Sequence, residues 1–156
     1  MRAIAREAGV GIATLYRHFP TRESLVEAVY RDQVVRLTSG AKELLSANVP
    51  AVALRRWMDL FGDWIATKNG MVDTLLTLIE SGDLAHARTR DELLAAIAAI
   101  LEAGQTVGDL RADVTAEEVA ASLIGIFTVA HQPGNTVDVG RLLDILLDGL
   151  RPQLDR

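Results

Sequence analysis

A short polar stretch near the start of the chain carries groups suited to binding nucleic acid. Thr14, Tyr16, Arg17 and His18 lie close together, and Arg22 follows them after a Pro-Thr pair. Hydroxyl, phenol and guanidinium groups contact phosphate oxygens, and an arginine can also reach a guanine edge. If the stretch is helical, these side chains lie away from its apolar seam. The pattern therefore predicts a surface that contacts DNA.

The residues around this stretch have the spacing of two short helices joined by a turn. Ala5 is small enough to let the helices approach, and Gly9, four residues later, tolerates a positive φ. Leu15 and Phe19 lie one turn apart and can face the first helix. An ordinary amphipathic hairpin can have the same spacing, so spacing alone leaves both interpretations open.

The sequence from Ile4 to about Val29 resembles the DNA-binding head of the TetR family of one-component transcriptional repressors. The residues that carry the resemblance are Ala5, Gly9, Thr14-Leu15-Tyr16, Phe19 and Thr21-Arg22-Glu23. The resemblance implies an all-α homodimer, in which a helix-turn-helix head joins a larger ligand-binding body. It implies phosphate contacts from Thr14, Tyr16, His18 and Arg22, and it places Gly11, Ile12, Ala13 and Arg17 nearest the bases. With Thr21 at the start of the next helix, the predicted DNA-binding residues are Gly11, Ile12, Ala13, Thr14, Tyr16, Arg17, His18, Thr21 and Arg22.

Two features depart from the family pattern. Position 12 is often basic or polar in the family but is isoleucine here, which suits contact with a thymine methyl group. Family members also carry another helix ahead of the turn, whereas three residues precede Ile4 here. We therefore expect a head that is incomplete at its N-terminus, with part of the cluster of Ile4, Ala8 and Leu15 exposed.

The charge distribution and composition narrow the class of protein. Residues 1–36 hold six arginines against four acidic residues, whereas the rest of the 156-residue chain holds ten basic against 17 acidic residues. A basic head on an acidic body fits a local phosphate contact. The chain has no cysteine, no signal-peptide pattern, no membrane-length apolar run and no catalytic motif. We expect a cytoplasmic, non-enzymatic protein without cofactor or metal and without membrane contact.

Helical patterns separated by glycine and proline cover the chain, which predicts an all-α fold. We expect a helix-turn-helix head at residues 1–36 and a helical ligand-binding and dimerisation domain at residues 37–156. Thr21 and Pro50 are expected to start helices, and Thr115 and Thr89 each have capping-box spacing. The other predicted ranges are Met1–Ala8, Gly11–Phe19, Met71–Ser81 and about Val137 to Leu150, with stops at Gly70 and Gly108.

An aromatic stripe in the body suggests a place for a small molecule. Trp57, Phe61 and Trp64 fall on one face of the helix that begins at Pro50. Met71 and Phe127 could complete a cavity wall, because aromatic and methionine side chains line many small-molecule sites. Such a stripe also packs an ordinary core, and this second interpretation stays open.

The last two helices are the candidates for dimerisation. The final helix is apolar over more than a narrow stripe, so it needs partners on two sides. A four-helix bundle, with two helices from each chain, would satisfy both sides, and the same leucines could instead fill a monomer core. The predicted interface residues are Ala121, Ile124, Gly125, Leu143, Leu146, Leu147 and Leu150.

These observations predict a ligand-responsive transcriptional regulator. We expect a homodimeric repressor that binds a palindromic double-stranded operator and is released by a small-molecule effector. One alternative is a helical small-molecule or partner-binding protein that has lost DNA binding because the first helix is absent. A second alternative is a helical hydrolase or metalloenzyme.

Overall fold

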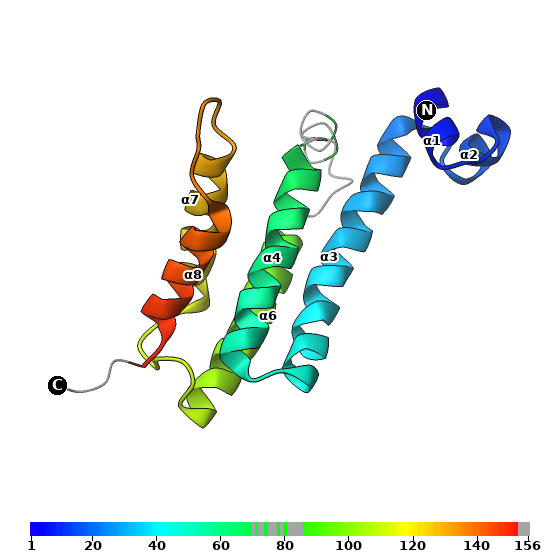
Figure 1. The fold of residues 1–156 in the computed structure, drawn as a ribbon. Coiled ribbons are helices and arrows are strands. Elements are labelled where there is room, and N and C mark those ends of the chain that lie inside the picture. Colours follow the sequence, from blue (N-terminus) through cyan, green and yellow to red (C-terminus); the bar gives the residue numbers. More distant parts are fainter. Residues whose placement is uncertain (70, 72–73, 75–77, 79, 81–85, 153–156) are drawn as a thin grey trace.

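A bundle of long helices carries a small two-helix head at one end (Figure 1). The computed structural model describes residues 1–69, 71, 74, 78, 80 and 86–152. These residues form helices and no strand, which confirms the predicted all-α class. The helices are α1 (Arg2–Glu7), α2 (Ile12–His18), α3 (Arg22–Ala47), α4 (Pro50–Asn69), α6 (His86–Val107), α7 (Ala116–Ala130) and α8 (Val139–Leu150). The predicted helix Met71–Ser81 lies largely outside the described residues.

The head is a helix-turn-helix whose turn depends on one glycine. Gly9 has φ +67°, and its N–H donates to Arg6 O while Val10 N–H donates to Ala5 O at 3.0 Å. These two bonds end α1 in the left-handed conformation that glycine adopts without steric penalty. Ala5 and Leu15 are buried where α1 and α2 meet, and Ile4 is 41% exposed.

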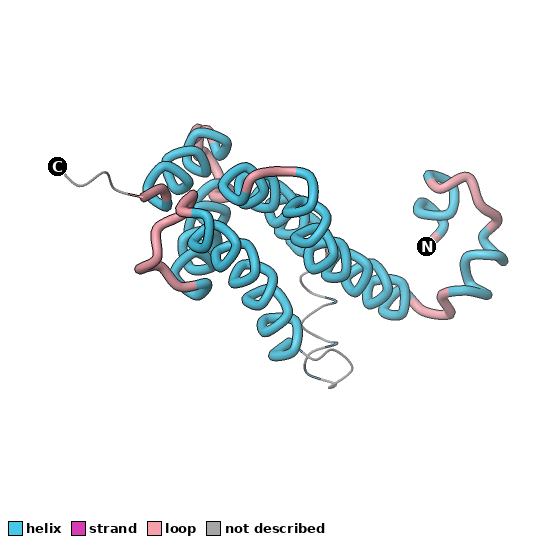
Figure 2. The backbone as a smooth tube through the Cα atoms, turned by 90° about the horizontal axis from the view of Figure 1, so that it is seen from below, coloured by secondary structure: helices cyan, strands magenta, loops and turns pink. Residues whose placement is uncertain are grey.

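A single long helix joins the head to the body. Thr21 caps α3 by accepting from Ser24 N–H, and the Ser24 hydroxyl oxygen accepts from Thr21 N–H in return. The reciprocal pair satisfies two backbone donors at the start of the helix. Helix α3 then continues without interruption into the bundle, so the predicted domain boundary after residue 36 falls inside it. Figure 2 shows the head projecting from the N-terminal end of α3, away from the rest of the bundle.

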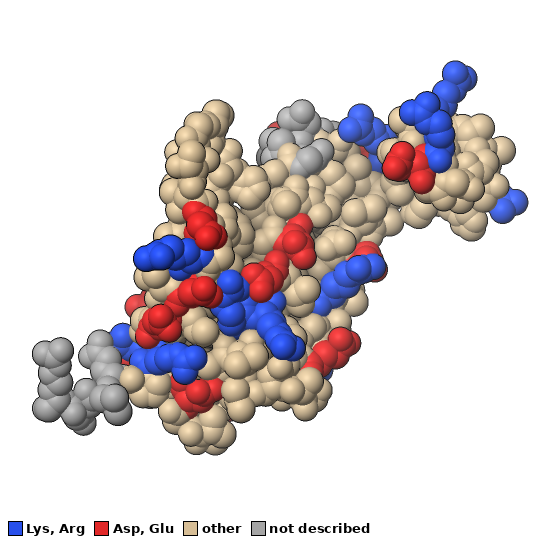
Figure 3. Space-filling model, viewed as in Figure 1, with Lys and Arg blue, Asp and Glu red and all other residues tan. Residues whose placement is uncertain are grey.

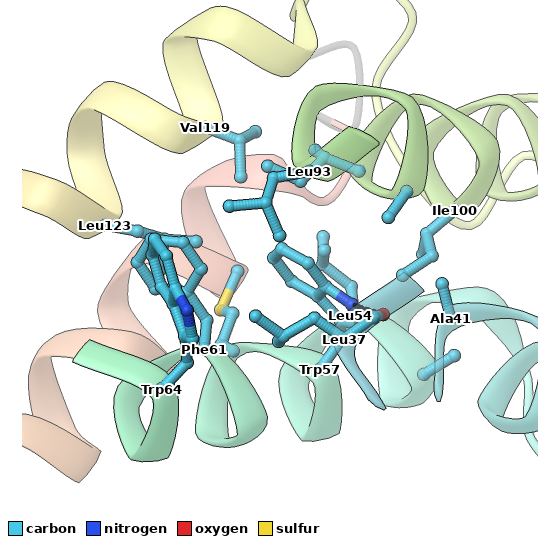
Figure 4. Packing of buried hydrophobic residues seen from close by; sticks show 14 of the residues in the cluster. Leu37, Ala41, Leu54, Trp57, Phe61, Trp64, Leu93, Ile100, Val119 and Leu123 are labelled. Carbon is cyan, nitrogen blue, oxygen red and sulfur yellow. Dashed lines mark hydrogen bonds between the residues drawn. The ribbon is translucent and has the colours of Figure 1, made fainter. Parts of the chain in front are cut away.

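The core of the body lies between α3, α4 and α6, with α7 and α8 packed on one side. Trp57, Phe61 and Trp64 project from one face of α4 into this core (Figure 4). Trp57 is fully buried, and its indole N–H donates to Leu37 O on α3 at 2.8 Å. The aromatic stripe read from the sequence therefore packs α4 against its neighbours.

The predicted helix ends agree with the structure in most cases. Pro50 opens α4, and Thr115 caps α7 in a capping box with Glu118. Gly108, at φ +74°, ends α6 and directs the carboxylate of Asp109 to Ala51 N–H at 2.7 Å. Asp109 thus supplies a hydrogen-bond acceptor to the first turn of α4 from a distant part of the chain.

The predicted capping box at Thr89 is wrong. Helix α6 begins at His86, so Thr89 lies within its first turn and is 9% exposed. Glu92, the expected capping partner, instead forms an ion pair with Arg88 at 3.0 Å. The Thr-x-x-Glu spacing also places residues on neighbouring turns inside a helix, so the pattern does not by itself mark a helix start.

Candidate functional site

The predicted DNA-binding residues all lie on the surface of the head. Each of the nine positions is exposed, including Tyr16 at 45% and Ile12 at 38%. Leu15, on the opposite face of α2, is buried and anchors the helix to α1. Figure 3 shows basic side chains projecting from the head. Helix α2 is thereby held by its apolar face and leaves its polar face available.

Arg17 and Arg22 are available for an anion, whereas two arginines further along α3 are already paired. Arg31 contacts Glu27 at 2.6 Å and Arg36 contacts Asp32 at 2.8 Å, both along α3. Arg17 and Arg22 form no ion pair with any residue in the described part of the chain. A guanidinium without an internal carboxylate can form a charge-assisted hydrogen bond to a phosphate oxygen.

The body contains a cavity of about 620 Å³ between α3, α4, α6 and α7. This volume falls within the range of roughly 300–1,000 Å³ that is typical of small-molecule sites. Its lining residues are Tyr30, Phe61, Trp64, Ile65, Lys68, Asn69, Thr89, Arg90, Leu93, Leu94, Ile97, Glu117, Ala120, Ala121, Ile124, Phe127, Thr128 and His131. Most of the buried wall is aliphatic or aromatic, so an apolar molecule would be favoured there.

The structure places the predicted ligand-binding residues in two groups. Phe61, Trp64 and Phe127 line the cavity, with the Phe61 ring centroid 5.3 Å from that of Trp64 and 6.0 Å from that of Phe127. Trp57 lies deeper in the core, and Met71 packs against that core; neither lines the cavity. The sequence could not tell which residues of the stripe pack in the core and which line the cavity. That difference depends on which part of the stripe the neighbouring helices cover.

Polar groups also line the cavity, and most of them belong to residues absent from the predicted set, among them Tyr30, Lys68 and Thr89. The hydroxyl of Tyr30 and the indole Nε1 of Trp64 are buried and have no hydrogen-bond partner among the described residues. Burial raises the pKa of Tyr30, and neighbouring Thr89 opposes the change, although the two side chains do not reach normal hydrogen-bond geometry. Lys68 Nζ lies 5.2 Å from the centre of the Trp64 ring, and burial lowers the pKa of this lysine. The spacing of Trp64 and Lys68, one turn apart, was a signal available in the sequence.

The predicted dimer residues fall on different surfaces of α7 and α8. Ala121 and Gly125 are exposed, Ile124 is 53% exposed, and Leu146 is half-buried. The other three predicted leucines pack inside the core of the same chain, which leaves them little surface for a partner. These buried residues are Leu143, Leu147 and Leu150, at 1%, 8% and 5% exposed.

The described residues contain neither a metal centre nor a membrane-spanning helix. No three His, Cys, Asp or Glu side chains there come together as metal ligands would. None of the helices described is long and apolar enough to cross a membrane. An exposed helix-turn-helix on a helical body with a largely apolar cavity defines the class of one-component DNA-binding regulators.

Comparison with known families identifies the chain more closely. Residues 1–29 match the family described as "Bacterial regulatory proteins, tetR family". Residues 49–152 match "Transcriptional regulator SbtR-like, C-terminal domain". The chain therefore belongs to the TetR family of transcriptional regulators. Regulators of this family are in general non-enzymatic DNA-binding proteins.

Individual relatives resemble the chain over almost its whole length. The TetR transcriptional regulator SCO0520 from Streptomyces coelicolor is 42% identical, with a TM-score of 0.88, over 97% of this chain and 86% of that one. A TetR transcription regulatory protein from Mycobacterium vanbaalenii is 35% identical, with a TM-score of 0.72, over 96% and 81%. The HTH-type transcriptional repressor KstR2 from Rhodococcus jostii is 27% identical over 96% of this chain and 80% of its own length. The similarity thus includes both the head and the body.

Proposed function

We propose that the protein is a homodimeric repressor that binds a palindromic operator through its two heads and releases it when a small molecule enters the cavity. Arg22, in the first turn of α3, would contact phosphate, and Arg17 on α2 would lie nearest the bases. Dimers of this class place two recognition helices about 34–36 Å apart, in successive major grooves. Such a regulator acts where the chromosome lies, so the proposal includes a cytoplasmic location and no catalytic activity.

The observation that carries the proposal is the course of α3. One continuous helix holds Arg22 in its first turn and Tyr30, a cavity-wall residue, eight residues later. At 1.5 Å per residue these positions are about 12 Å apart along a rigid element. A ligand that shifts Tyr30 would therefore shift the head as well. To release the operator, the ligand needs only to bind more tightly to the dimer conformation in which the spacing of the two heads no longer matches the operator.

The exposed faces of α7 and α8 support the dimer. Ile145 on α8 is 57% exposed, and exposed Gly125 permits close approach on α7. Ile124 and Ala121 are also exposed, at the edge of α7 that lines the cavity. Two copies of α7 and α8 would cover these side chains in a four-helix arrangement. Native mass spectrometry should give twice the chain mass, and Ile145→Glu should shift the protein towards the monomer, because it would place a charge in an apolar interface.

Operator binding tests the regulatory function directly. The protein should bind a palindromic duplex from its own promoter region, as measured by fluorescence anisotropy over a series of salt concentrations. Arg22→Ala should reduce the slope of log affinity against log salt concentration by about 1.8 for a dimer, because each head loses one phosphate contact worth ~0.9. Arg31→Ala is the matched control, since Arg31 is already paired with Glu27. A protein that binds no duplex at low salt, or equal slopes for the two variants, would contradict the proposal.

A further inference from the structure

Two residues that line the cavity carry buried polar groups without a hydrogen-bond partner among the described residues. Tyr30 and Trp64 are 2% and 6% exposed, and their ring centroids lie 6.2 Å apart. The Tyr30 hydroxyl and the Trp64 indole N–H are both buried without a partner among the described residues. An indole N–H can only donate. Because buried polar groups in folded proteins are nearly always paired, two unpaired groups on neighbouring rings that line the cavity indicate a missing acceptor.

A positive charge lies beside these donors. Lys68 Nζ is 5.2 Å from the Trp64 ring centre, and both residues line the cavity. This half-buried lysine forms no ion pair with a described residue. An ammonium group can only donate hydrogen bonds, and partial burial makes it costly without a counter-ion. Tyr30, Trp64 and Lys68, here called the donor cluster, thus share a need for an acceptor that carries negative charge.

The other charged groups at the cavity do not supply that acceptor. Arg90 on α6 adds a second cation to the lining, and His131 at the end of α7 holds its Nδ1 2.6 Å from Phe127 O. Glu117 is the acidic lining residue among those described, and it lies exposed at the start of α7. It forms no ion pair with Lys68 or Arg90. The wall formed by α4 and the start of α6 therefore keeps a net positive character.

The rest of the cavity suits a hydrocarbon or aromatic body. Phe61, Leu93, Ile97 and Phe127 are buried and line it. The volume of about 620 Å³ leaves room for a molecule much larger than the anionic group alone. Apolar surface buried against such walls contributes roughly 25 cal/mol per Å² to binding.

We propose that the effector is an apolar carboxylic acid, whose carboxylate is held by the donor cluster and whose body lies among the buried apolar side chains. This inference rests on the proposed function, because it takes the cavity to be the effector site. The carboxylate would accept hydrogen bonds from the Tyr30 hydroxyl and the Trp64 indole and would pair with Lys68. Binding would therefore satisfy all three groups that the ligand-free protein leaves unpaired.

Matched probe molecules test the proposal. Phenylhexanoate, phenylhexanol and phenylhexylamine share one apolar body and differ in the charge and hydrogen bonding of the end group. Isothermal titration calorimetry on the full chain should give phenylhexanoate an affinity on the order of tenfold or more above the other two, because charge-assisted hydrogen bonds are about twice as strong as neutral ones. Equal or tighter binding of the alcohol or the amine would overturn the inference.

Two substitutions test whether the preference for the carboxylate arises at the donor cluster. Lys68→Met keeps the aliphatic stem and removes the charge, so it should weaken phenylhexanoate binding by about tenfold and leave phenylhexanol unchanged. Lys42→Met is the matched control, since Lys42 is exposed on α3 and is the chain's other lysine. Tyr30→Phe removes one unpartnered hydroxyl, so it should fold normally and lower the affinity for the carboxylate alone. If both Lys68→Met and Tyr30→Phe still prefer phenylhexanoate as strongly as the wild type does, the assignment is overturned.

Operator binding, measured in parallel, separates this inference from the proposed function. A protein that binds its operator and none of the three probes would overturn the ligand class and leave the regulatory function supported. A protein that binds phenylhexanoate selectively but no operator would support the ligand class and overturn the regulatory function. If phenylhexanoate releases the wild-type protein from its operator, and releases the Lys68→Met protein only at a higher concentration, both the ligand class and the regulatory function are supported.

Discussion

Gly62 on α4 lies directly against the ring of Phe127, and replacing it tests how closely α4 and α7 pack beside the cavity. A Cβ atom at residue 62 would lie 2.7 Å from both Cε1 and Cζ of Phe127. Carbon atoms in contact prefer about 3.5–4.0 Å, so the ring would have to retreat by roughly 1 Å. The ring also packs against Phe61, with centroids 6.0 Å apart. Gly62→Ala should therefore disturb the packing around the cavity.

The expected change in stability is the difference of two opposing effects. Overpacking a well-packed site costs about 1–3 kcal/mol. Alanine in place of glycine inside a helix contributes up to about 1 kcal/mol in the other direction. Gly62→Ala should therefore lower the free energy of unfolding by about 1 kcal/mol, and a chain of this length should lose roughly 2–4 °C in melting temperature.

Gly149 provides a matched control for the same substitution. A Cβ atom there would meet no neighbouring side chain within 4 Å, and the residue is exposed in α8. Gly149→Ala should raise the free energy of unfolding by about 0.5–1 kcal/mol, because only the helix effect operates. Urea denaturation followed by circular dichroism, at one fixed protein concentration, should give opposite signs for the two variants.

A double-mutant cycle tests whether the Phe127 ring causes the loss of stability in the Gly62→Ala protein. Phe127→Leu shortens the side chain opposite residue 62, so it should destabilise the Gly62→Ala protein less than it destabilises the wild type. The expected interaction energy between the two sites is about 0.5–3 kcal/mol. If Gly62→Ala stabilises as much as Gly149→Ala does, or if the two changes in the cycle are additive, the close packing of α4 and α7 is refuted.

Two further substitutions test the contacts that position the body helices. Asp109→Ala removes the acceptor of Ala51 N–H, so it should lower the free energy of unfolding by about 1 kcal/mol, measured by urea denaturation; an unchanged midpoint would contradict the capping role. Arg55 bridges Asp144 on α8 at 2.6 Å and Asp59 on α4 at 2.7 Å, so Arg55→Met should lower the thermal midpoint through a loss of about 1 kcal/mol. Arg56→Met is its control, because Arg56 is exposed and pairs with no described residue; equal effects would show that the bridge does not hold α8 in place.

Local signals in the sequence determined where most helices begin and end. The stop at Gly9 and the caps at Thr21 and Thr115 depend on hydrogen bonds between residues three to five positions apart, which the sequence displays directly. The polar face of α2 could be predicted in the same way, since Leu15 and Tyr16 are adjacent and the apolar pattern indicates which one is buried. The Thr-x-x-Glu pattern at Thr89 predicted a helix start wrongly, because the same spacing also occurs within a helix.

Only the tertiary structure decided which residues meet around the cavity. Trp57 and Trp64 belong to one stripe of α4, yet Trp57 donates to α3 inside the core while the Trp64 N–H has no partner at the cavity wall. Tyr30 reaches Trp64 from another helix, and Leu143 on α8 is covered by the chain's own core rather than by a partner. Helical periodicity specifies a face of each helix, but the packing of helices distant in the sequence determines what covers that face. The sequence therefore determined the helices and the family, and the packing determined the cavity and its unpaired donors.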